Sequence, residues 1–270
     1  MGKCNSLVWH VQLTLDHARK PSGYGGWRPG AGRPRTRDGV SHDRRDPVSP
    51  RHPQHVTLRI VDGLPSLRSD RLAPLIRGSI SRSHREGFGI AEFNVEPNHL
   101  HLILEAASNE ARARGLKGLN ASIARQVNKA VGRRGELFDD RYHARSLRTP
   151  REVRNALRYV LNNARHHQLS NYYTPDWIDP CSSAPWFKGW REPVLPDTSW
   201  KRALLAEPSP VAEPATWLLR VGWRRHGEIA FDEVPGLKSR TKRSPAPIDL
   251  EPYESAEEAL HVLALLEAEG

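Results

Sequence analysis

The sequence predicts an α+β fold in which helices cover an antiparallel β-sheet. Two kinds of pattern support this prediction. Four stretches are rich in β-branched or alternating apolar residues, as in half-buried strands, and three stretches repeat apolar residues at helical spacing. In chain order they are strand, helix, strand, strand, helix, strand and helix, which is typical of an α+β domain.

The first strand and the first helix are expected between residues 54 and 85. Residues 54–61 are rich in β-branched side chains and predict a strand. Residues 68–85 predict a helix, and Gly87 is expected to end it. The inward stripe of this helix would be Leu72, Leu75, Ile76 and Ile80.

A hairpin is expected next, with strands at residues 88–95 and 99–105. Because side chains alternate along a strand, His99 and His101 share one face and lie roughly 7 Å apart. The other face would carry Leu100, Leu102 and Leu104. Two imidazoles on one face can share a divalent metal ion. The alternative is a pair of half-buried histidines that are hydrogen-bonded to the backbone.

The second helix and the last strand follow this hairpin. The helix is expected to end at Gly135, after the basic pair Arg133 and Arg134. Its apolar stripe is Leu116, Leu119, Ile123, Val127 and Ala130. Residues 137–147 then predict a strand or extended segment with three arginines, which are either phosphate clamps or a solvated surface row. These are Arg141, Arg145 and Arg148.

The last helix has a marked start at Pro150. Thr149 supplies an N-cap hydroxyl and Glu152 completes a capping box. The apolar stripe that follows is Val153, Ala156, Leu157, Val160, Leu161 and Ala164. Tyr159 and Asn163 lie one turn apart at its margin, where a side chain is held by a packed helix and can still face a cleft. Tyr159 is therefore a candidate nucleophile, and the alternative is an ordinary boundary tyrosine with its hydroxyl in water.

Two motifs resemble a known family, the single-tyrosine HUH transposases, which include the IS200-like Y1 transposase domain and the REP-associated tyrosine transposases. The motifs are the strand triplet His99-Leu100-His101 and the helix motif Tyr159-Val160-Leu161-Asn162-Asn163, with supporting residues at 138–143. The resemblance covers residues 52–167. It implies a ferredoxin-like or RRM-like antiparallel sheet, with two helices on one face and the tyrosine helix near the other.

The resemblance also implies a function for the motif residues. Tyr159 would attack a phosphodiester of single-stranded or hairpin DNA, forming a 5′-phosphotyrosine link and leaving a free 3′-hydroxyl. His99, His101 and Asn163 would hold Mg²⁺ or Mn²⁺. Because the link keeps the energy of the phosphodiester, a second 3′-hydroxyl can reverse the step and join strands without ATP.

The chemistry of these groups sets further expectations. A tyrosine hydroxyl has a pKa near 10, so presenting it as phenolate at neutral pH costs about 4 kcal/mol unless a base or metal assists. Imidazoles alone favour zinc or copper, so a hard cation needs oxygen ligands from Asn163, water and the DNA phosphate. We therefore expect weak metal binding in the absence of DNA. Tyr142 is the second candidate nucleophile, and we expect it instead to serve in packing or in backbone contact.

The composition independently indicates a nucleic-acid partner. The 270 residues include 41 Lys and Arg against 31 Asp and Glu, a net charge of +10 that attracts phosphate. The sequence predicts three parts. Residues 1–51 form a basic flexible extension, residues 52–168 form the nuclease or transposase domain, and residues 169–270 form a Pro- and Trp-rich extension that ends in a short acidic helix.

Both extensions leave alternatives open. Arg28, Arg33 and Arg35 lie in a segment that resembles an AT-hook, which binds the minor groove, and the alternative is a solvated basic linker. The aromatic residues after residue 171 either stack on unpaired bases or staple an irregular tail onto the domain. The two cysteines are isolated, and the sequence shows neither a long apolar run nor a signal-peptide core. We expect a soluble, cytoplasmic protein with no membrane partner.

Two classes of function remain open at this point. One is a metal-dependent single-strand DNA endonuclease and strand transferase, and the other is a non-catalytic DNA-binding regulatory protein on the same scaffold. Both a monomer and a homodimer fit the pattern. In the resembling family the tyrosine helix can lie beside the histidines of its own chain or of the other subunit.

Overall fold

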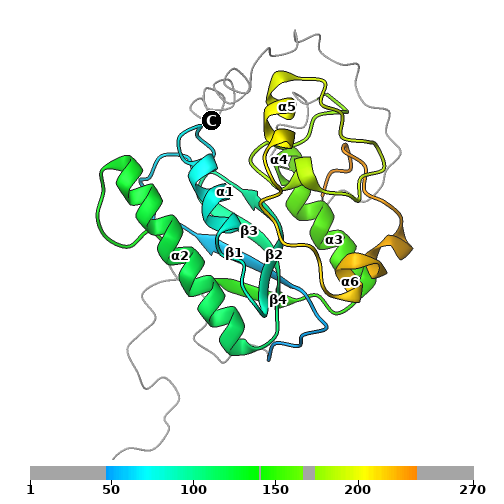
Figure 1. Ribbon diagram of the computed structural model, residues 1–270, viewed down its shortest axis with the longest axis horizontal. Helices are drawn as coiled ribbons and strands as arrows, with labels where there is room; N and C mark the ends of the chain where they lie inside the picture. Colours follow the sequence, from blue (N-terminus) through cyan, green and yellow to red (C-terminus); the bar gives the residue numbers. More distant parts are fainter. Residues whose placement is uncertain (1–46, 140, 167–173, 236–270) are drawn as a thin grey trace, which may run out of the picture. The chain divides into compact units, whose positions relative to one another are not determined.

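The computed structural model describes residues 47–139, 141–166 and 174–235 (Figure 1). The strands are β1 (Gln54–Arg59), β2 (Phe88–Val95), β3 (His99–Ala106) and β4 (His143–Ser146). The longer helices are α1 (Ala73–Ser81), α2 (Asn109–Val131), α3 (Pro150–Leu161) and α5 (Ser199–Ala206). The shorter ones are α4 (Asn163–His166), α6 (Trp217–Arg220) and the 3₁₀ turns η3 (Ala184–Trp186) and η4 (Gly222–His226).

The four strands form one antiparallel sheet in the order β2-β3-β1-β4. This order, with helices between β1 and β2 and between β3 and β4, confirms the α+β class and the ferredoxin-like sheet. The register places His101 of β3 opposite Thr57 of β1 and opposite Asn94 of β2. Residues that lie opposite one another share a face of the sheet, so these three side chains form one row.

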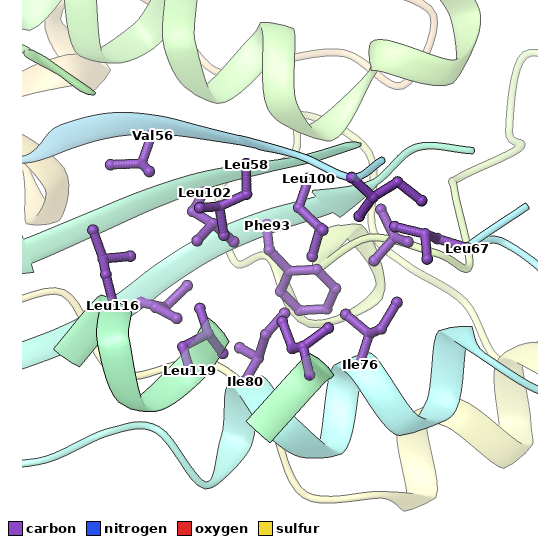
Figure 2. Packing of buried hydrophobic residues seen from close by; sticks show 14 of the residues in the cluster. Val56, Leu58, Leu67, Ile76, Ile80, Phe93, Leu100, Leu102, Leu116 and Leu119 are labelled. Atoms are coloured by element: carbon purple, nitrogen blue, oxygen red, sulfur yellow. The ribbon is translucent and has the colours of Figure 1, made fainter. Parts of the chain in front are cut away.

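One face of the sheet is apolar and is covered by α1 and α2. Figure 2 shows the strand side chains pointing into the space between the sheet and these helices. All are almost completely shielded from solvent, and each contributes about 1.5–3 kcal/mol by burial. From the sheet they include Val56, Leu58, Phe93, Leu100 and Leu102, and from the helices Ile76, Ile80, Leu116 and Leu119.

The opposite face of the sheet is covered by α3, as Figure 1 also shows. A second apolar cluster forms there around Ile103 of β3. It joins α3 to residues that follow position 174, and so the later part of the chain packs onto the same helix. Its members include Leu157, Val160, Ile178, Trp190, Leu219, Trp223 and Phe231.

The first helix is shorter than the sequence predicts. The expected helix spans residues 68–85, whereas α1 spans only Ala73–Ser81. Pro74 lies in the first turn, where its missing N–H has no helical partner to lose, and the residues before it form turns. Gly87, with φ +71°, lies in the bend before β2 and does not end the helix.

The second helix and the last strand also differ from the prediction. The expected end at Gly135 is wrong, because α2 ends at Val131 and is capped by Gly132 in the left-handed region at φ +69°. The N–H of Arg133 then binds the carbonyl of Asn128, as in a Schellman motif. The strand expected over residues 137–147 is reduced to β4, although Phe138 forms a single bridge with Ile60.

The start of α3 is confirmed and its end is not as expected. Thr149 and Glu152 form the capping box at Pro150. However, α3 ends at Leu161, and Asn162 leaves the helical region with φ −111° and ψ 22°. The amide of Asn162 donates to the carbonyls of Ala230 and Glu233, which tie this break to the later chain. Tyr159 and Asn163 therefore lie on two successive helices, α3 and α4, and not on one.

Among the described residues of the later chain, three aromatic side chains are buried in the core, Trp190, Trp223 and Phe231. Trp190 and Trp223 are buried, and their indole N–H groups donate to the carbonyls of Ala184 and Leu219. Trp217, by contrast, is about half exposed. Burial thus favours the stapling alternative for these residues. No helix in the described part of the chain is long and apolar enough to cross a membrane.

Two predicted DNA-binding or packing segments lie outside the described residues. These are the AT-hook-like segment with Arg28, Arg33 and Arg35, and the acidic helix expected at residues 255–266.

Candidate active site

Two histidines of β3 meet on the sheet face that α3 covers. Nε2 of His99 lies 3.0 Å from Nε2 of His101, and the rings are nearly perpendicular, at 85°. His99 is half-buried, whereas His101 is 5% exposed. Nδ1 of His99 contacts Oδ1 of Asn98 at 2.7 Å, so the second nitrogen of this ring is held from the turn that precedes the strand.

The imidazole of His101 is oriented from the neighbouring strand β1. Its Nδ1 lies 3.2 Å from the hydroxyl of Thr57 and 3.3 Å from Nε2 of His55. Burial, followed by the charges of Arg145 and His143, lowers the pKa of His55 to about 4. His55 is therefore neutral at pH 7 and can exchange a hydrogen bond with His101. Only the pairing of β1 with β3 brings His55 to this site, because 46 positions separate the two rings in the sequence.

Tyr159 of α3 reaches His101 of this pair. Its hydroxyl lies 3.4 Å from Nε2 of His101, and the two ring centres are 5.0 Å apart. Burial and the negative charge of Glu96 raise the pKa of Tyr159. The structure thus brings His99, His101 and Tyr159 together within one chain, with the phenol held in its protonated form.

Asn163 is tied to this group through Glu96, a residue that the sequence does not single out. Asn163 is fully buried, and its Nδ2 donates to Oε1 of Glu96 at 2.9 Å. The carboxylate fixes which amide atom is the nitrogen, because a carboxylate accepts and does not donate. Oδ1 of Asn163 is then a buried oxygen with no hydrogen-bond partner among the described residues. The backbone N–H of Glu96 binds the carbonyl of His99 at 2.9 Å, which anchors this carboxylate at the start of β3.

The donor set fits a metal ion that takes further ligands from outside the protein. At a metal–imidazole distance of about 2.1 Å, two nitrogens at a right angle lie about 3 Å apart, close to the observed separation of 3.0 Å. The described residues include no group of three or more His, Cys, Asp or Glu side chains arranged to hold an ion. The unpartnered Oδ1 of Asn163 is an available hard oxygen. If two imidazoles and this amide oxygen held such an ion, its remaining positions would be left to water and phosphate.

A buried polar network fixes α3 against the sheet. Asn94 donates to the carbonyl of Val160 at 2.9 Å and to Asp179 at 3.0 Å. Arg68 forms a bidentate ion pair with the same Asp179 at 2.8 and 3.0 Å. Because Val160 follows Tyr159 directly, this network positions the helix turn that carries the phenol. Sequence periodicity gives no sign of it, since its members lie up to 111 residues apart.

The three predicted arginines lie at or near the β4 edge. Arg145 lies opposite His55 in the pairing of β4 with β1, so it is on the same face of the sheet as the histidines. Arg141 and Arg148 are exposed and flank β4 in the sequence. Tyr142, the second candidate nucleophile, packs against the apolar cluster under α1 and α2. Its ring therefore belongs to the packing of the other side of the sheet, as expected.

Comparison with known proteins agrees with this geometry. Residues 69–163 match the model of the family described as "Transposase IS200 like". Over this segment the chain is similar to the IS200-like transposases. The match includes His99, His101, Tyr159 and Asn163, and it confirms the resemblance inferred from the sequence motifs. His55 and Thr57 precede the matched segment.

A solved structure described as the REP-associated tyrosine transposase bound to a REP hairpin is also similar. The two chains are 18% identical, the match covers 66% of this chain and 100% of the other, and the TM-score is 0.43. A search of curated proteins found no match.

Proposed function

We propose that this protein is a metal-assisted single-strand DNA endonuclease and strand transferase that acts through Tyr159. The observation that carries the proposal is the meeting of three side chains, since Nε2 of His101 lies 3.0 Å from His99 and 3.4 Å from the hydroxyl of Tyr159. A nucleophile beside a pair of imidazoles, on an IS200-like segment, fits transposase chemistry better than a structural role.

The reaction is a transesterification at one phosphodiester. The oxygen of Tyr159 forms a bond to phosphorus while the bond from phosphorus to O3′ breaks. The phenol gives up its proton and the leaving O3′ gains one, so the step is balanced without water or ATP. The product is a 5′-phosphotyrosine link and a free 3′-hydroxyl, and attack by a second 3′-hydroxyl reverses the step and joins strands.

His99, His101 and the oxygen of Asn163 are the proposed metal ligands. Mg²⁺ or Mn²⁺ at these residues would polarise the scissile phosphate and lower the cost of a Tyr159 phenolate. His55 and Thr57 keep the His101 ring in place, and Glu96 keeps the Asn163 amide in place. Because burial and Glu96 raise the pKa of Tyr159, we expect a nucleophile that is inert until cation and DNA are both bound.

Single-stranded or hairpin DNA is the proposed substrate. The net charge of +10 and the arginines Arg141, Arg145 and Arg148 near the β4 edge would hold its phosphates. The similar REP-associated transposase is described as bound to a REP hairpin, which favours folded repeat DNA over a plain strand.

The test is formation of a covalent protein–DNA adduct. The full-length protein is incubated with hairpin-flanked single strands and Mn²⁺, then separated on a denaturing gel. A 5′-phosphotyrosine link predicts that a 3′-end label travels with the protein, while a 5′-end label stays on a free fragment that a polymerase can extend. Chelation of the metal should abolish both products.

A matched pair of variants assigns the nucleophile. Tyr159→Phe should form no adduct, whereas Tyr142→Phe should form it at the normal level. An adduct with Tyr159→Phe would reject the assignment. Hairpin binding by the wild type with no adduct under any metal would instead support the non-catalytic DNA-binding protein.

A further inference from the structure

The outer face of α2 carries charges of one sign. This helix lies beside α1 on the apolar side of the sheet, and its buried stripe faces the core (Figure 1). It contains five Lys and Arg residues against a single acid, Glu110, in its first turn. The positions that point away from the core recur every three or four residues and are exposed. They are Arg114, Lys117, Ala121, Arg125 and Lys129.

The cations gather in two groups along this helix. One group is Lys117 with Arg85, which reaches α2 from the segment before β2. Nη2 of Arg85 lies 2.8 Å from the place that a Cβ at Gly118 would take, so its guanidinium rests on the surface of α2. The other group is Arg125 and Lys129, which lie one helical turn apart. All four of these residues are exposed.

The charges of these two groups are not neutralised within the described part of the chain. None of the four side chains forms an ion pair there. Arg114 differs from them, because it lies one turn after Glu110 and offsets its charge. Arg125 and Lys129 repel each other, which lowers the stability of the helix. A face that keeps like charges together in spite of this repulsion is typical of a surface that binds a polyanion.

The spacing of the two groups matches the major groove of DNA. Lys117 and Arg125 are eight residues apart, which is about 12 Å along a helix that rises about 1.5 Å per residue. The outward residues between them, Gly118 and Ala121, are small, so no bulky side chain separates the groups. The major groove of B-DNA is about 12 Å wide and has a phosphate backbone on each side. Each group of cations can therefore meet one of the two backbones.

The residue types on this face favour paired over unpaired bases. Surfaces that bind single strands combine cations with aromatic rings on which the bases stack. The exposed positions from Ala113 to Lys129 hold only Arg, Lys and Ala, so they offer no such ring. The partner that fits is a nucleic acid whose bases already stack on one another in a duplex. A-form RNA fits less well, because its major groove is deep and narrow.

We propose that the outer face of α2 binds the double-helical stem of a DNA hairpin, with the two backbones of its major groove at the two groups of cations. The contacts are to phosphates, so they position the stem without reading its sequence. The inference rests on the proposed function, because it takes the stem to belong to the DNA that Tyr159 cleaves. It adds a second surface, since α2 covers the face of the sheet opposite to α3.

The test measures binding of a labelled DNA hairpin to the full-length protein by fluorescence anisotropy, without divalent metal. Arg125→Gln/Lys129→Gln removes one group of cations and introduces residues that still favour a helix. It should weaken hairpin binding at least about tenfold at about 0.1 M salt and reduce the salt slope by about two. An unchanged affinity and slope in this variant, when it is folded, overturns the proposal.

Two further double variants locate the surface. Arg85→Gln/Lys117→Gln removes the other group and should have the same effect, and it decides the test if the first variant does not fold. Arg191→Gln/Arg220→Gln removes two exposed cations of the later chain and should change the slope by less than about one-half. An equal loss in this control would show a general effect of net charge and overturn the assignment to α2.

Three ligands of equal length identify the partner. They are the DNA hairpin, an RNA hairpin of the same sequence and a thymine strand that cannot pair. Arg125→Gln/Lys129→Gln should change binding of the thymine strand by less than about threefold, and the wild type should bind the RNA hairpin more weakly than the DNA hairpin. An equal loss for hairpin and strand overturns the assignment to a duplex. An RNA hairpin that binds as tightly as the DNA hairpin overturns the fit to a DNA major groove.

The outcomes also separate this proposal from the proposed nuclease activity. In the adduct assay, Arg125→Gln/Lys129→Gln should raise the hairpin concentration needed for half-maximal adduct formation about tenfold. A protein that forms the Tyr159 adduct but keeps its salt slope in both α2 variants loses only the stem surface. A protein whose slope falls in these variants but that forms no adduct keeps the stem surface and loses the nuclease.

Discussion

The two faces of the β-sheet are built from the same strands and differ in the groups that the strands present, mainly aliphatic on one face and partly polar on the other. In β3, Leu100 and Leu102 point to the α1 and α2 side, into the main apolar cluster, while His99 and His101 point to the α3 side. The α3 side also carries Thr57, Asn94 and Glu92, which are polar and buried or half-buried. A strand can thus serve stability and chemistry at once, because its side chains alternate.

Hydrogen bonds between neighbouring strands hold the side chains of the polar face in place. Burial of a carboxyl, imidazole or amide costs free energy unless the group forms hydrogen bonds inside the protein. The free energy gained by burying apolar side chains on the other face offsets what remains of this cost. The polar groups in turn bind one another across strands, as His101 does with Thr57 and His55. We therefore expect substitutions on the α3 side to change activity and pH dependence, and those on the α1 and α2 side to change stability.

The largest expected effect is on the chemistry of the α3 side. His99→Ala should reduce the rate of covalent adduct formation at least 100-fold, because a proposed metal ligand is lost. Its melting temperature should change by no more than about 2 °C, since His99 is only half-buried. Adduct formation and thermal unfolding are measured on the same preparation. A variant that unfolds early would show that this histidine is part of the core.

The second effect is the pH dependence that Glu92 brings to the α3 side. Its folded pKa of about 8 lies above the ordinary value of 4.5, so the folded protein holds a proton that the unfolded chain releases. Stability from this group is complete below pH 4.5 and is lost as the pH rises to 8. Between pH 5 and pH 8 the loss should be on the order of 4 kcal/mol. Urea unfolding at both pH values should show a smaller loss in Glu92→Gln, and equal losses would contradict the assignment.

The third effect is on the apolar face, at Leu100, the residue that follows His99 in the sequence. Leu100→Ala should lower the free energy of unfolding by about 2–5 kcal/mol, because Leu100 is fully buried in the core cluster. Well below the melting temperature, its rate of adduct formation should stay within about threefold of the wild type. Denaturant unfolding measures the free energy of unfolding, and the adduct assay measures the rate of adduct formation. A large loss of rate in folded protein would mean that the two faces are coupled.

The smallest effect concerns the start of the helix that carries Tyr159. Thr149→Ala removes the hydroxyl that accepts the N–H of Glu152, and should cost about 1 kcal/mol and about 2–4 °C in melting temperature. Thr149→Ser keeps the hydroxyl and should recover most of this loss. If neither substitution has any effect, the packing of α3 alone fixes its start.

Much of this protein follows from its sequence. Alternation in residues 99–105 placed the two histidines on one face, and the spacing of apolar residues placed Tyr159 at the margin of a helix with a capping box at Pro150. These features are local, because they depend on strand and helix periods and on groups within four residues of each other. The order of the elements also followed, since each has its own period.

Tertiary structure alone decided the rest of the candidate site. His55, Thr57 and Glu96 reach the histidines and Asn163 only because β1 pairs with β3 and because the turn before β3 lies against α4. The break of the helix at Asn162 depends on carbonyls about 70 residues later. Such contacts join residues far apart in the chain, so no local period encodes them, and their energies arise only when the sheet and its helices are packed.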